Sequence, residues 1–431
     1  MQGGIVLEKL VITGDKCLKG EVIISGAKNA AVALIPATLL LNGTCTIFNL
    51  PNISDIKLYI EILESLGVKV TWNNKNSVKL DTRSISPSNS TIELTKKFRA
   101  SYYLIGSMLG RLGVAEVGLP GGCQLGPRPI DQHIKGFEAL GAKVVVEDEK
   151  ITAKANKLTG TNIFLDVVSV GATINILLAS VLAKGVTVIE NAAKEPHVVD
   201  VANLLNVMGA DIIGAGTDVI KINGVPELKG NYIYSVVPDQ IEAGTFMLAA
   251  VATKGDITVR NCTPEHLDAL IAKIKEVGAE VHPINGDSLR VIGKKRPKHT
   301  NLKTAPYPGF PTDLQSQMGV VLSIANGNSR IFENIWESRF QYTHALNRMG
   351  ANITDHGKYA VFRGVEKLHG ASVYSTDLRA GAALLIAGIV ASGTTELHNL
   401  QHIDRGYEDI EGKFIRLGAE MERVEAEEET M

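Results

Sequence analysis

Ala139-Leu140-Gly141-Ala142-Lys143-Val144 joins the end of an apolar, helix-like segment to a Gly and then to the start of a β-like run. A Gly at this place is the residue expected one position past a helix, where the backbone turns into the left-handed conformation. The pattern occurs in six copies, spaced by roughly 70 residues, a period longer than that of solenoid repeats. The glycines of the other five copies are Gly67, Gly209, Gly278, Gly350 and Gly418.

A second signal precedes the copies by about 25 residues and consists of a Gly followed by a β-rich run. Gly43-Thr44-Cys45-Thr46-Ile47 and Gly185-Val186-Thr187-Val188-Ile189 are examples. Each unit therefore reads as helix, Gly, strand, loop, helix, Gly and strand. Chance recurrence of a common helix cap is the alternative, but the two signals recur in phase. Six such units predict an α/β (α+β) protein of two domains, with three units in each.

The boundary between the domains is expected after the third unit, near Val236-Val237-Pro238-Asp239. Residues 10–25 read as strands that have no partner in their own half. If they pair with the C-terminal half, the chain crosses between the domains twice, once near Gly26-Ala27 and once near the boundary. We therefore predict one domain of residues 1–28 plus 238–431 and another of residues 29–237. Residues at the crossings are candidates for a ligand site, because ligands commonly bind between domains.

Composition excludes several classes of protein. The 431 residues carry a formal net charge of −2, whereas a nucleic-acid binder would present a basic face. The four Cys form no CxxC pair, so they predict neither a disulfide framework nor a zinc site and fit a reducing compartment. The longest uncharged apolar runs, about a dozen residues, are too short to span a bilayer. We expect a cytoplasmic protein with no metal, no cofactor, and no nucleic-acid, membrane or obligate protein partner.

Residues 119–133 have the composition of a loop that closes over a ligand. This stretch holds three Gly and three Pro around Cys123 and Arg128, without a hydrophobic period of helix or strand. A cation near the thiol favours the thiolate, so Cys123 is a candidate acid, base or nucleophile. The alternative is a buried Cys without a chemical role.

Several cations and one acid stand where loops meet helices. Lys28 lies at a strand-to-helix junction, where its ammonium and backbone N–H groups can bind one anion. The guanidinium group offers donors matched to carboxylate and phosphate, and similar junctions hold Arg99, Arg339, Arg379 and Arg405. Asp313 follows a Pro-rich loop and could take a proton from a substrate hydroxyl. Ordinary surface ion pairs and a helix N-terminal carboxylate are the competing interpretations.

In these residues the chain resembles the UDP-N-acetylglucosamine 1-carboxyvinyltransferase family, and the resemblance runs from Leu18 to about Arg423. The most specific motif is the Pro-Gly-Gly-Cys loop with Arg128-Pro129. The resemblance implies a two-domain inverted α/β barrel, with three units around an approximate threefold axis in each domain. It also implies transfer of the enolpyruvyl group of phosphoenolpyruvate to the 3-hydroxyl of UDP-N-acetylglucosamine, with release of phosphate. Addition gives a tetrahedral intermediate, and elimination follows.

The resemblance also implies roles for individual residues. Cys123 protonates the methylene carbon as general acid, and Asp313 handles the proton of the sugar hydroxyl. Lys28, Arg128 and Arg405 hold the phosphate and carboxylate of phosphoenolpyruvate, while Arg339, Asp377 and Arg379 complete the site. The residues implied in binding the nucleotide sugar are Asn29, Arg99, Arg128, Pro129, Ile130, Asp131, Gln132, Val170, Gly171, Asp313 and Ile335. The thiol is also the expected target of fosfomycin, an epoxide phosphonate that mimics phosphoenolpyruvate.

Two other functions stay open at this point. A 3-phosphoshikimate 1-carboxyvinyltransferase shares the repeat architecture, but the Pro-Gly-Gly-Cys loop is not part of its pattern. A non-catalytic paralogue that binds the nucleotide sugar and regulates a partner would need none of the reactive residues, which this chain retains. The chain also departs from the family at Val167, where relatives often have Lys, and at Gln240, where Arg is common.

Overall fold

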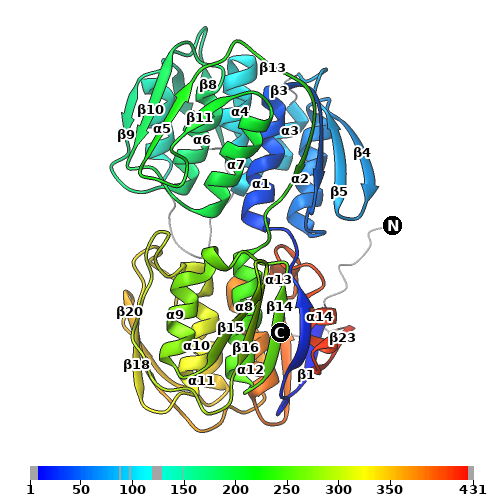
Figure 1. Ribbon diagram of the computed structural model, residues 1–431, viewed down its shortest axis with the longest axis vertical. Helices are drawn as coiled ribbons and strands as arrows, with labels where there is room; N and C mark the ends of the chain where they lie inside the picture. Colours follow the sequence, from blue (N-terminus) through cyan, green and yellow to red (C-terminus); the bar gives the residue numbers. More distant parts are fainter. Residues whose placement is uncertain (1–7, 87–88, 97–98, 119–128, 148, 426–431) are drawn as a thin grey trace. The chain divides into compact units, whose positions relative to one another are not determined.

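The computed structural model describes residues 8–86, 89–96, 99–118, 129–147 and 149–425. These residues form two compact units. The first unit contains the described residues from 26 to 237, and the second contains residues 8–25 and 238–425. In Figure 1 the colours show that the dark blue N-terminal strand belongs to the same unit as the yellow-to-red part of the chain.

Three helices form the interior of the second unit. These are α8 (Gln240–Ala252), α10 (Gln315–Ser323) and α12 (Leu378–Val390), and they pack against one another (Figure 1). All residues from Ile241 to Ala252 in α8 are buried, and most of them are apolar, as expected for a helix in the core. The helices with one exposed face are α9 (Asp268–Glu276), α11 (Tyr342–Arg348) and α14 (Ile410–Arg416), and short turns are η3 (Pro264–Leu267), η4 (Thr312–Leu314) and α13 (Gln401–Asp404).

The first unit repeats this arrangement. Its most buried helices are α1 (Lys28–Ala37), α4 (Tyr103–Leu112) and α6 (Val170–Ser180), with α4 packed against both of the others. Its remaining helical segments are η1 (Thr38–Leu40), α2 (Ser54–Ser65), α3 (Asn89–Lys96), η2 (Arg99–Tyr102), α5 (Asp131–Ala139) and α7 (Pro196–Val207).

Each unit has three sheets in its described part. The strands of the first unit are β3 (Leu41–Phe48), β4 (Lys69–Asn74), β5 (Ser77–Asp81), β6 (Val114–Gly118), β7 (Lys143–Val146), β8 (Lys150–Lys154), β9 (Asn162–Phe164), β10 (Val186–Glu190), β11 (Asp211–Ile213), β12 (Val219–Asn223) and β13 (Leu228–Ser235). The sheet orders are β13-β3-β5-β4, β6-β8-β7 and β11-β12-β10-β9.

The sheets of the second unit have the orders β21-β22-β1-β23, β15-β16-β14-β2 and β17-β18-β20-β19. Their strands are β1 (Glu8–Thr13), β2 (Lys19–Ile23), β14 (Asp256–Arg260), β15 (Glu280–Asn285), β16 (Ser288–Ile292), β17 (Leu302–Lys303), β18 (Asn328–Phe332), β19 (Asn352–Asp355), β20 (Tyr359–Arg363), β21 (Ser372–Tyr374), β22 (Thr394–His398) and β23 (Glu420–Glu425). One edge strand in each of these sheets is parallel to its neighbour, and the other pairings are antiparallel. The three sheets and three inner helices of each unit confirm the predicted α/β class and the sixfold repeat.

The six repeated glycines end helices as predicted. Gly67, Gly141, Gly209, Gly278, Gly350 and Gly418 all have positive φ, between 88° and 101°. Each lies between an outer helix and the next strand, as Gly278 does between α9 and β15. Residues with a Cβ rarely adopt this conformation, so Gly is the residue that lets each helix end and the strand start within two positions.

The N-terminal strands pair with strands from the C-terminal half of the chain. Strand β1 lies antiparallel between β22 and β23, and β2 lies parallel to β14. In the second unit the Asp239 N–H donates to the Ser25 carbonyl at 2.9 Å, and in the first unit the Ala27 N–H donates to the Val237 carbonyl at 2.8 Å. The segments 25–27 and 237–239 are therefore hydrogen-bonded side by side.

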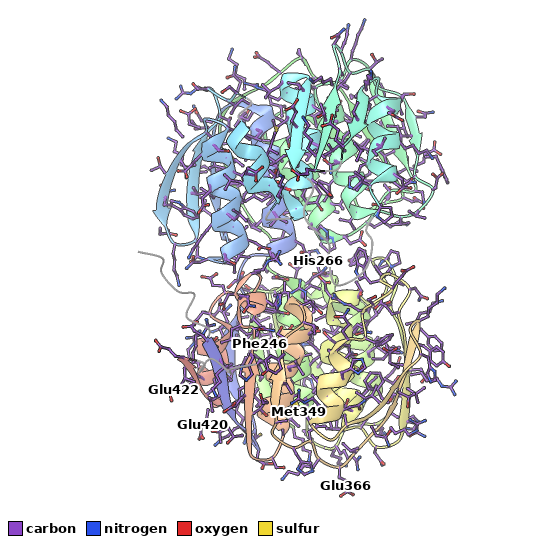
Figure 2. The ribbon with its side chains drawn as sticks, turned by 180° about the vertical axis from the view of Figure 1, so that it is seen from behind. Phe246, His266, Met349, Glu366, Glu420 and Glu422 are labelled. Atoms are coloured by element: carbon purple, nitrogen blue, oxygen red, sulfur yellow. The ribbon has the colours of Figure 1, made fainter. Side chains whose placement is uncertain are left out.

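Side chains separate into interior and surface within each unit. In the second unit Phe246 and Met349 are fully buried, whereas Glu366, Glu420 and Glu422 are exposed at its edge (Figure 2). Each unit has its own large apolar core. Among the described residues, no helix has the length and apolar character needed to cross a membrane.

Candidate functional site

Asp313, Arg339, Asp377 and Arg379 form one cluster in the second unit, called here the Asp313 cluster. Arg379 Nη2 donates to Asp313 Oδ2 at 2.9 Å, and Arg339 Nη2 donates to Asp313 Oδ1 at 3.1 Å. Arg339 Nη1 also lies 3.7 Å from Asp377 Oδ1. Two guanidinium groups and two carboxylates therefore share one network.

Local structure explains how these side chains come together. Asp313 lies in the turn η4 directly before α10, and Asp377 is the N-cap of α12. The Asp377 carboxylate accepts the backbone N–H groups of Arg379 at 2.8 Å and Ala380 at 3.2 Å, which satisfies donors at the helix start. Since α10 and α12 pack together, their N-terminal residues meet at one end of the helix trio.

The cluster is buried on its cationic side. The side chains of Arg339 and Arg379 are only 3% and 4% exposed, whereas that of Asp313 is 26% exposed. Burial works against the charge of Arg379, but Asp313, Tyr407 and Asp239 together outweigh it and hold the pKa of this guanidinium above its ordinary value. Arg379 Cζ also lies 5.5 Å from the centroid of the Tyr407 ring. Arg379 thus stays charged in the interior.

Two donors of this cluster have no acceptor. Arg339 Nε and Arg379 Nη1 are both buried and lack a hydrogen-bond partner among the described residues. Most buried donors in proteins are paired, so an unpaired guanidinium N–H is a place where an anionic ligand can bind. The cluster can therefore orient Asp313 and offer a donor to a carboxylate or a phosphate.

Arg405 follows α13 in the same unit. Burial lowers the pKa of His402, and the charge of Arg405 lowers it further, while Asp377 opposes the shift. His402 therefore lies within electrostatic reach of both Arg405 and Asp377. The residue before Arg405, Asp404, accepts two hydrogen bonds from Arg423, at 2.8 and 3.1 Å. This bidentate pair anchors the helix that precedes Arg405.

Ile335, another predicted binding residue, lies in a turn after β18. Its backbone N–H donates to Glu333 Oε1 at 2.8 Å, and the Trp336 N–H donates to the same oxygen at 3.2 Å. The backbone at Ile335 is thus held by a neighbouring carboxylate.

In the first unit, Lys28 starts α1 and forms an ion pair with Asp55 at 2.7 Å. The side chains are 12% and 4% exposed, so this pair is largely shielded from water. Asn29 follows Lys28 in the same turn. The first turn of α1 contains no acidic residue, which leaves the positive end of the helix dipole beside the ammonium group.

The starts of α5 and α6 carry further predicted residues. Gln132 Nε2 donates to Asp131 Oδ2 at 2.8 Å and to Asp166 Oδ2 at 3.1 Å. Val170 and Gly171 open α6, whose N-cap is Ser169. A Cβ on Gly171 would lie 2.8 Å from His133 Nε2, so only Gly allows this close approach of the two helices.

The remaining predicted residues are less informative. Pro129 is exposed and Ile130 half-buried, directly before α5. Arg99 begins η2. Cys123 and Arg128 lie outside the described residues. Asp55, Glu333 and Arg423 are contacts that the sequence prediction missed, and no spacing or motif distinguishes them from other charged residues. Within the described ranges, no three His, Cys, Asp or Glu side chains are grouped as metal ligands.

Comparison with known proteins assigns the chain to a family. A family model described as EPSP synthase (3-phosphoshikimate 1-carboxyvinyltransferase) matches residues 12–414. A UDP-N-acetylglucosamine 1-carboxyvinyltransferase of Clostridium botulinum is 55% identical over 97% of this chain and 100% of its own length. A protein of the same name, numbered 3, from Caldanaerobacter subterraneus is 53% identical over 97% of this chain and 100% of its own.

The chain belongs to the UDP-N-acetylglucosamine 1-carboxyvinyltransferase family. It is therefore an enzyme of the transferase class. Solved structures share the fold of this chain. The enolpyruvyl transferase NikO from Streptomyces tendae has a TM-score of 0.88 and 25% identity, covering 98% of this chain and 100% of that one. EPSP synthase from Acinetobacter baumannii, at 19% identity, shares the fold with a TM-score of 0.75 over 97% of this chain and 100% of that one.

Proposed function

We propose that the protein transfers the enolpyruvyl group of phosphoenolpyruvate to the 3-hydroxyl of UDP-N-acetylglucosamine and releases phosphate. This is the first committed step of peptidoglycan synthesis and a cytoplasmic reaction. The observation that carries the proposal is the Asp313 cluster, with its buried guanidinium groups, in a chain 55% identical to a relative with this name.

The reaction needs one proton donor and one proton acceptor. In the addition step, the sugar oxygen bonds to C2 of phosphoenolpyruvate while its proton passes to a base. C3 gains a proton from an acid, which gives a tetrahedral phospholactoyl intermediate. Elimination then removes a proton from C3 and expels phosphate. We assign the acid to Cys123 and the base to Asp313.

The substrates carry several negative charges, so fixed cations stabilise both their binding and the charge that develops during the reaction. We assign the phosphate and carboxylate of phosphoenolpyruvate to Lys28, Arg128 and Arg405. Arg339, Asp377 and Arg379 complete the site around these groups. The loop that contains Cys123 would exclude water, which otherwise screens the cations and intercepts a cationic intermediate.

The nucleotide sugar requires hydrogen-bond donors and acceptors rather than further cations alone. The start of α6 offers backbone N–H groups to a diphosphate, which supports a role for Val170 and Gly171. The other residues assigned to this substrate are Asn29, Arg99, Arg128, Pro129, Ile130, Asp131, Gln132, Asp313 and Ile335. Val167 is exposed and occupies a position where relatives often have Lys. We therefore assign no contact with the diphosphate to this position.

Phosphate release with both substrates tests the proposal. The wild type is expected to release phosphate from phosphoenolpyruvate with UDP-N-acetylglucosamine and not with shikimate 3-phosphate. Cys123→Ser should slow the release by about 10²–10⁴, the usual contribution of a positioned acid. Release only with shikimate 3-phosphate would identify the sister activity, and binding of the nucleotide sugar without turnover would identify a sensor.

A further inference from the structure

Glu333 lies directly after β18 and is 4% exposed. Its Oε1 accepts hydrogen bonds from the backbone N–H groups of Ile335 and Trp336, at 2.8 and 3.2 Å, and from Thr304 Oγ1 at 2.8 Å. Its Oε2 accepts a hydrogen bond from Thr312 Oγ1 at 3.0 Å. Four donors from three separate segments therefore meet on one carboxylate.

A buried carboxylate is costly unless its hydrogen bonds are satisfied. Over the described ranges, Glu333 forms no ion pair with Lys or Arg, and its carboxylate is held by neutral hydroxyl and backbone donors. A charged group in such a place is effective at holding neutral donors, because a hydrogen bond to a charged acceptor is stronger than one to a neutral acceptor.

Two of the segments held by Glu333 carry residues of the proposed site. The turn after β18 contains Ile335, whose N–H is occupied by Glu333, so the acceptor left on this residue is its carbonyl oxygen. Thr312 directly precedes Asp313, and its carbonyl also accepts a hydrogen bond from Arg339 Nη2 at 3.3 Å. Glu333 thus holds the residue before Asp313, while Arg339 and Arg379 hold the carboxylate of Asp313 itself.

We propose that Glu333 is a positioning residue for the nucleotide sugar. It aligns the backbone at Ile335 with the carboxylate of Asp313, so that one substrate can contact both. This inference rests on the proposed function. It predicts that Glu333 affects the nucleotide sugar and the chemical step, while binding of phosphoenolpyruvate, assigned to Lys28, Arg128 and Arg405, is affected little.

The test is Glu333→Gln, which keeps the shape of the side chain and removes its charge. We expect the KM for UDP-N-acetylglucosamine to rise by about tenfold and kcat to fall, because misplacement by a fraction of an ångström is costly in a reacting complex. The KM for phosphoenolpyruvate at saturating nucleotide sugar should change by less than about twofold. Thr312→Val removes one donor to Glu333. It should raise the KM for UDP-N-acetylglucosamine too, but by less than Glu333→Gln does.

Two controls separate positioning from stability. Leu346→Ala removes a fully buried side chain of α11 and should lower the melting temperature without changing the ratio of the two KM values. Glu276→Gln removes an exposed carboxylate that also accepts a threonine hydroxyl, from Thr300 at 2.6 Å, and should leave activity unchanged. Calorimetric binding of UDP-N-acetylglucosamine measures the effect of Glu333→Gln without turnover.

Equal increases in both KM values for Glu333→Gln, or no change in either, would overturn the inference while the proposed function stands. A wild type that binds the nucleotide sugar but releases no phosphate would instead reject the proposed function. In that case weaker calorimetric binding by Glu333→Gln still supports the positioning role, and unchanged binding rejects it. A wild type that does not bind the nucleotide sugar would reject both.

Discussion

Arg379 Nη2 lies 2.9 Å from Asp313 Oδ2, although 66 positions of sequence separate the two residues. Arg339 takes the other carboxylate oxygen at 3.1 Å. With each oxygen bound to a different guanidinium group, rotation of the carboxylate is restricted. A proton acceptor must be positioned before it can act, and this pair of contacts fixes the orientation of Asp313 before any substrate arrives.

Asp313→Asn should therefore reduce activity and stability together. We expect kcat to fall by about 10²–10⁴ through loss of the proton acceptor. We also expect the free energy of unfolding to fall by about 1–3 kcal/mol, because the buried guanidinium of Arg379 loses its carboxylate partner and that of Arg339 keeps only Asp377. Phosphate release and urea unfolding measure the two effects. Asp256→Asn is the matched control, since it breaks the exposed bidentate pair with Arg290 and should cost below about 1 kcal/mol with full activity.

Fosfomycin should alkylate Cys123 selectively, and faster when the nucleotide sugar is present. Burial raises the pKa of the Cys45 thiol to about 12 and that of Cys262 to about 11, so both carry little of the reactive thiolate. Cys17 is exposed and serves as an internal control for alkylation that does not depend on binding of fosfomycin at the site. Mass spectrometry of the digested protein locates the adduct. Equal labelling of Cys17 and Cys123 would contradict a phosphonate held beside the thiol.

Asp200 should make the stability of the first unit depend on pH. Burial raises the pKa of its carboxyl to about 6, although the Tyr234 hydroxyl donates to Oδ1 at 2.6 Å and favours the charged form. The folded chain then binds the proton more tightly than the unfolded chain. The free energy of unfolding consequently falls as pH rises from about 4 to about 6, by about 1–3 kcal/mol from this group.

Urea unfolding of wild type and Asp200→Asn across this range checks the effect. The wild type should lose stability relative to the variant as pH rises, because the Asn side chain does not titrate. Asp211→Asn, at an exposed position on β11, should follow the wild type. Parallel curves for the wild type and Asp200→Asn would contradict the prediction.

Gly278→Ala should destabilise the second unit by about 1–2 kcal/mol. Gly278 has a φ of 92°, while the nearest atom to an added Cβ, on Lys298, is 3.7 Å away. The expected cost is therefore backbone strain rather than a steric clash. Gly286→Ala provides the comparison. Gly286 does not have a positive φ, and beyond its chain neighbours no atom lies within 4 Å of an added Cβ. A similar free energy of unfolding for both variants would argue against strain at the helix end.

The local parts of the fold could be predicted from the sequence. A Gly after an apolar helical segment and before a β-like run has a local cause, and all six copies end their helices with positive φ. Sheet order has no such local cause. Strand β13 is parallel to β3, with Leu228 opposite Leu41, and neither strand carries a pattern that specifies a partner so far along the chain.

In the candidate site, too, the sequence predicts local features but not the contacts that depend on tertiary structure. Asp313 could be singled out because it follows a Pro-rich loop, but its partners Arg339 and Arg379 depend on the packing of α10 against α12. Glu333 could not be found at all, because Phe332-Glu333-Asn334 has the appearance of an ordinary strand end. Its importance comes from Thr304 and Thr312, which tertiary structure brings to its carboxylate.

The pairing of β1 with β22 and β23 has a consequence for synthesis of the protein on the ribosome. Glu8 pairs with Glu425, so β1 emerges long before the strands that flank it exist. At a usual translation rate the delay is on the order of half a minute. The continuous segment from Gly26 to Val237 can collapse during that interval, while the early strands remain unpaired edges. Nascent chains should therefore expose this strand to chaperones until translation nears its end.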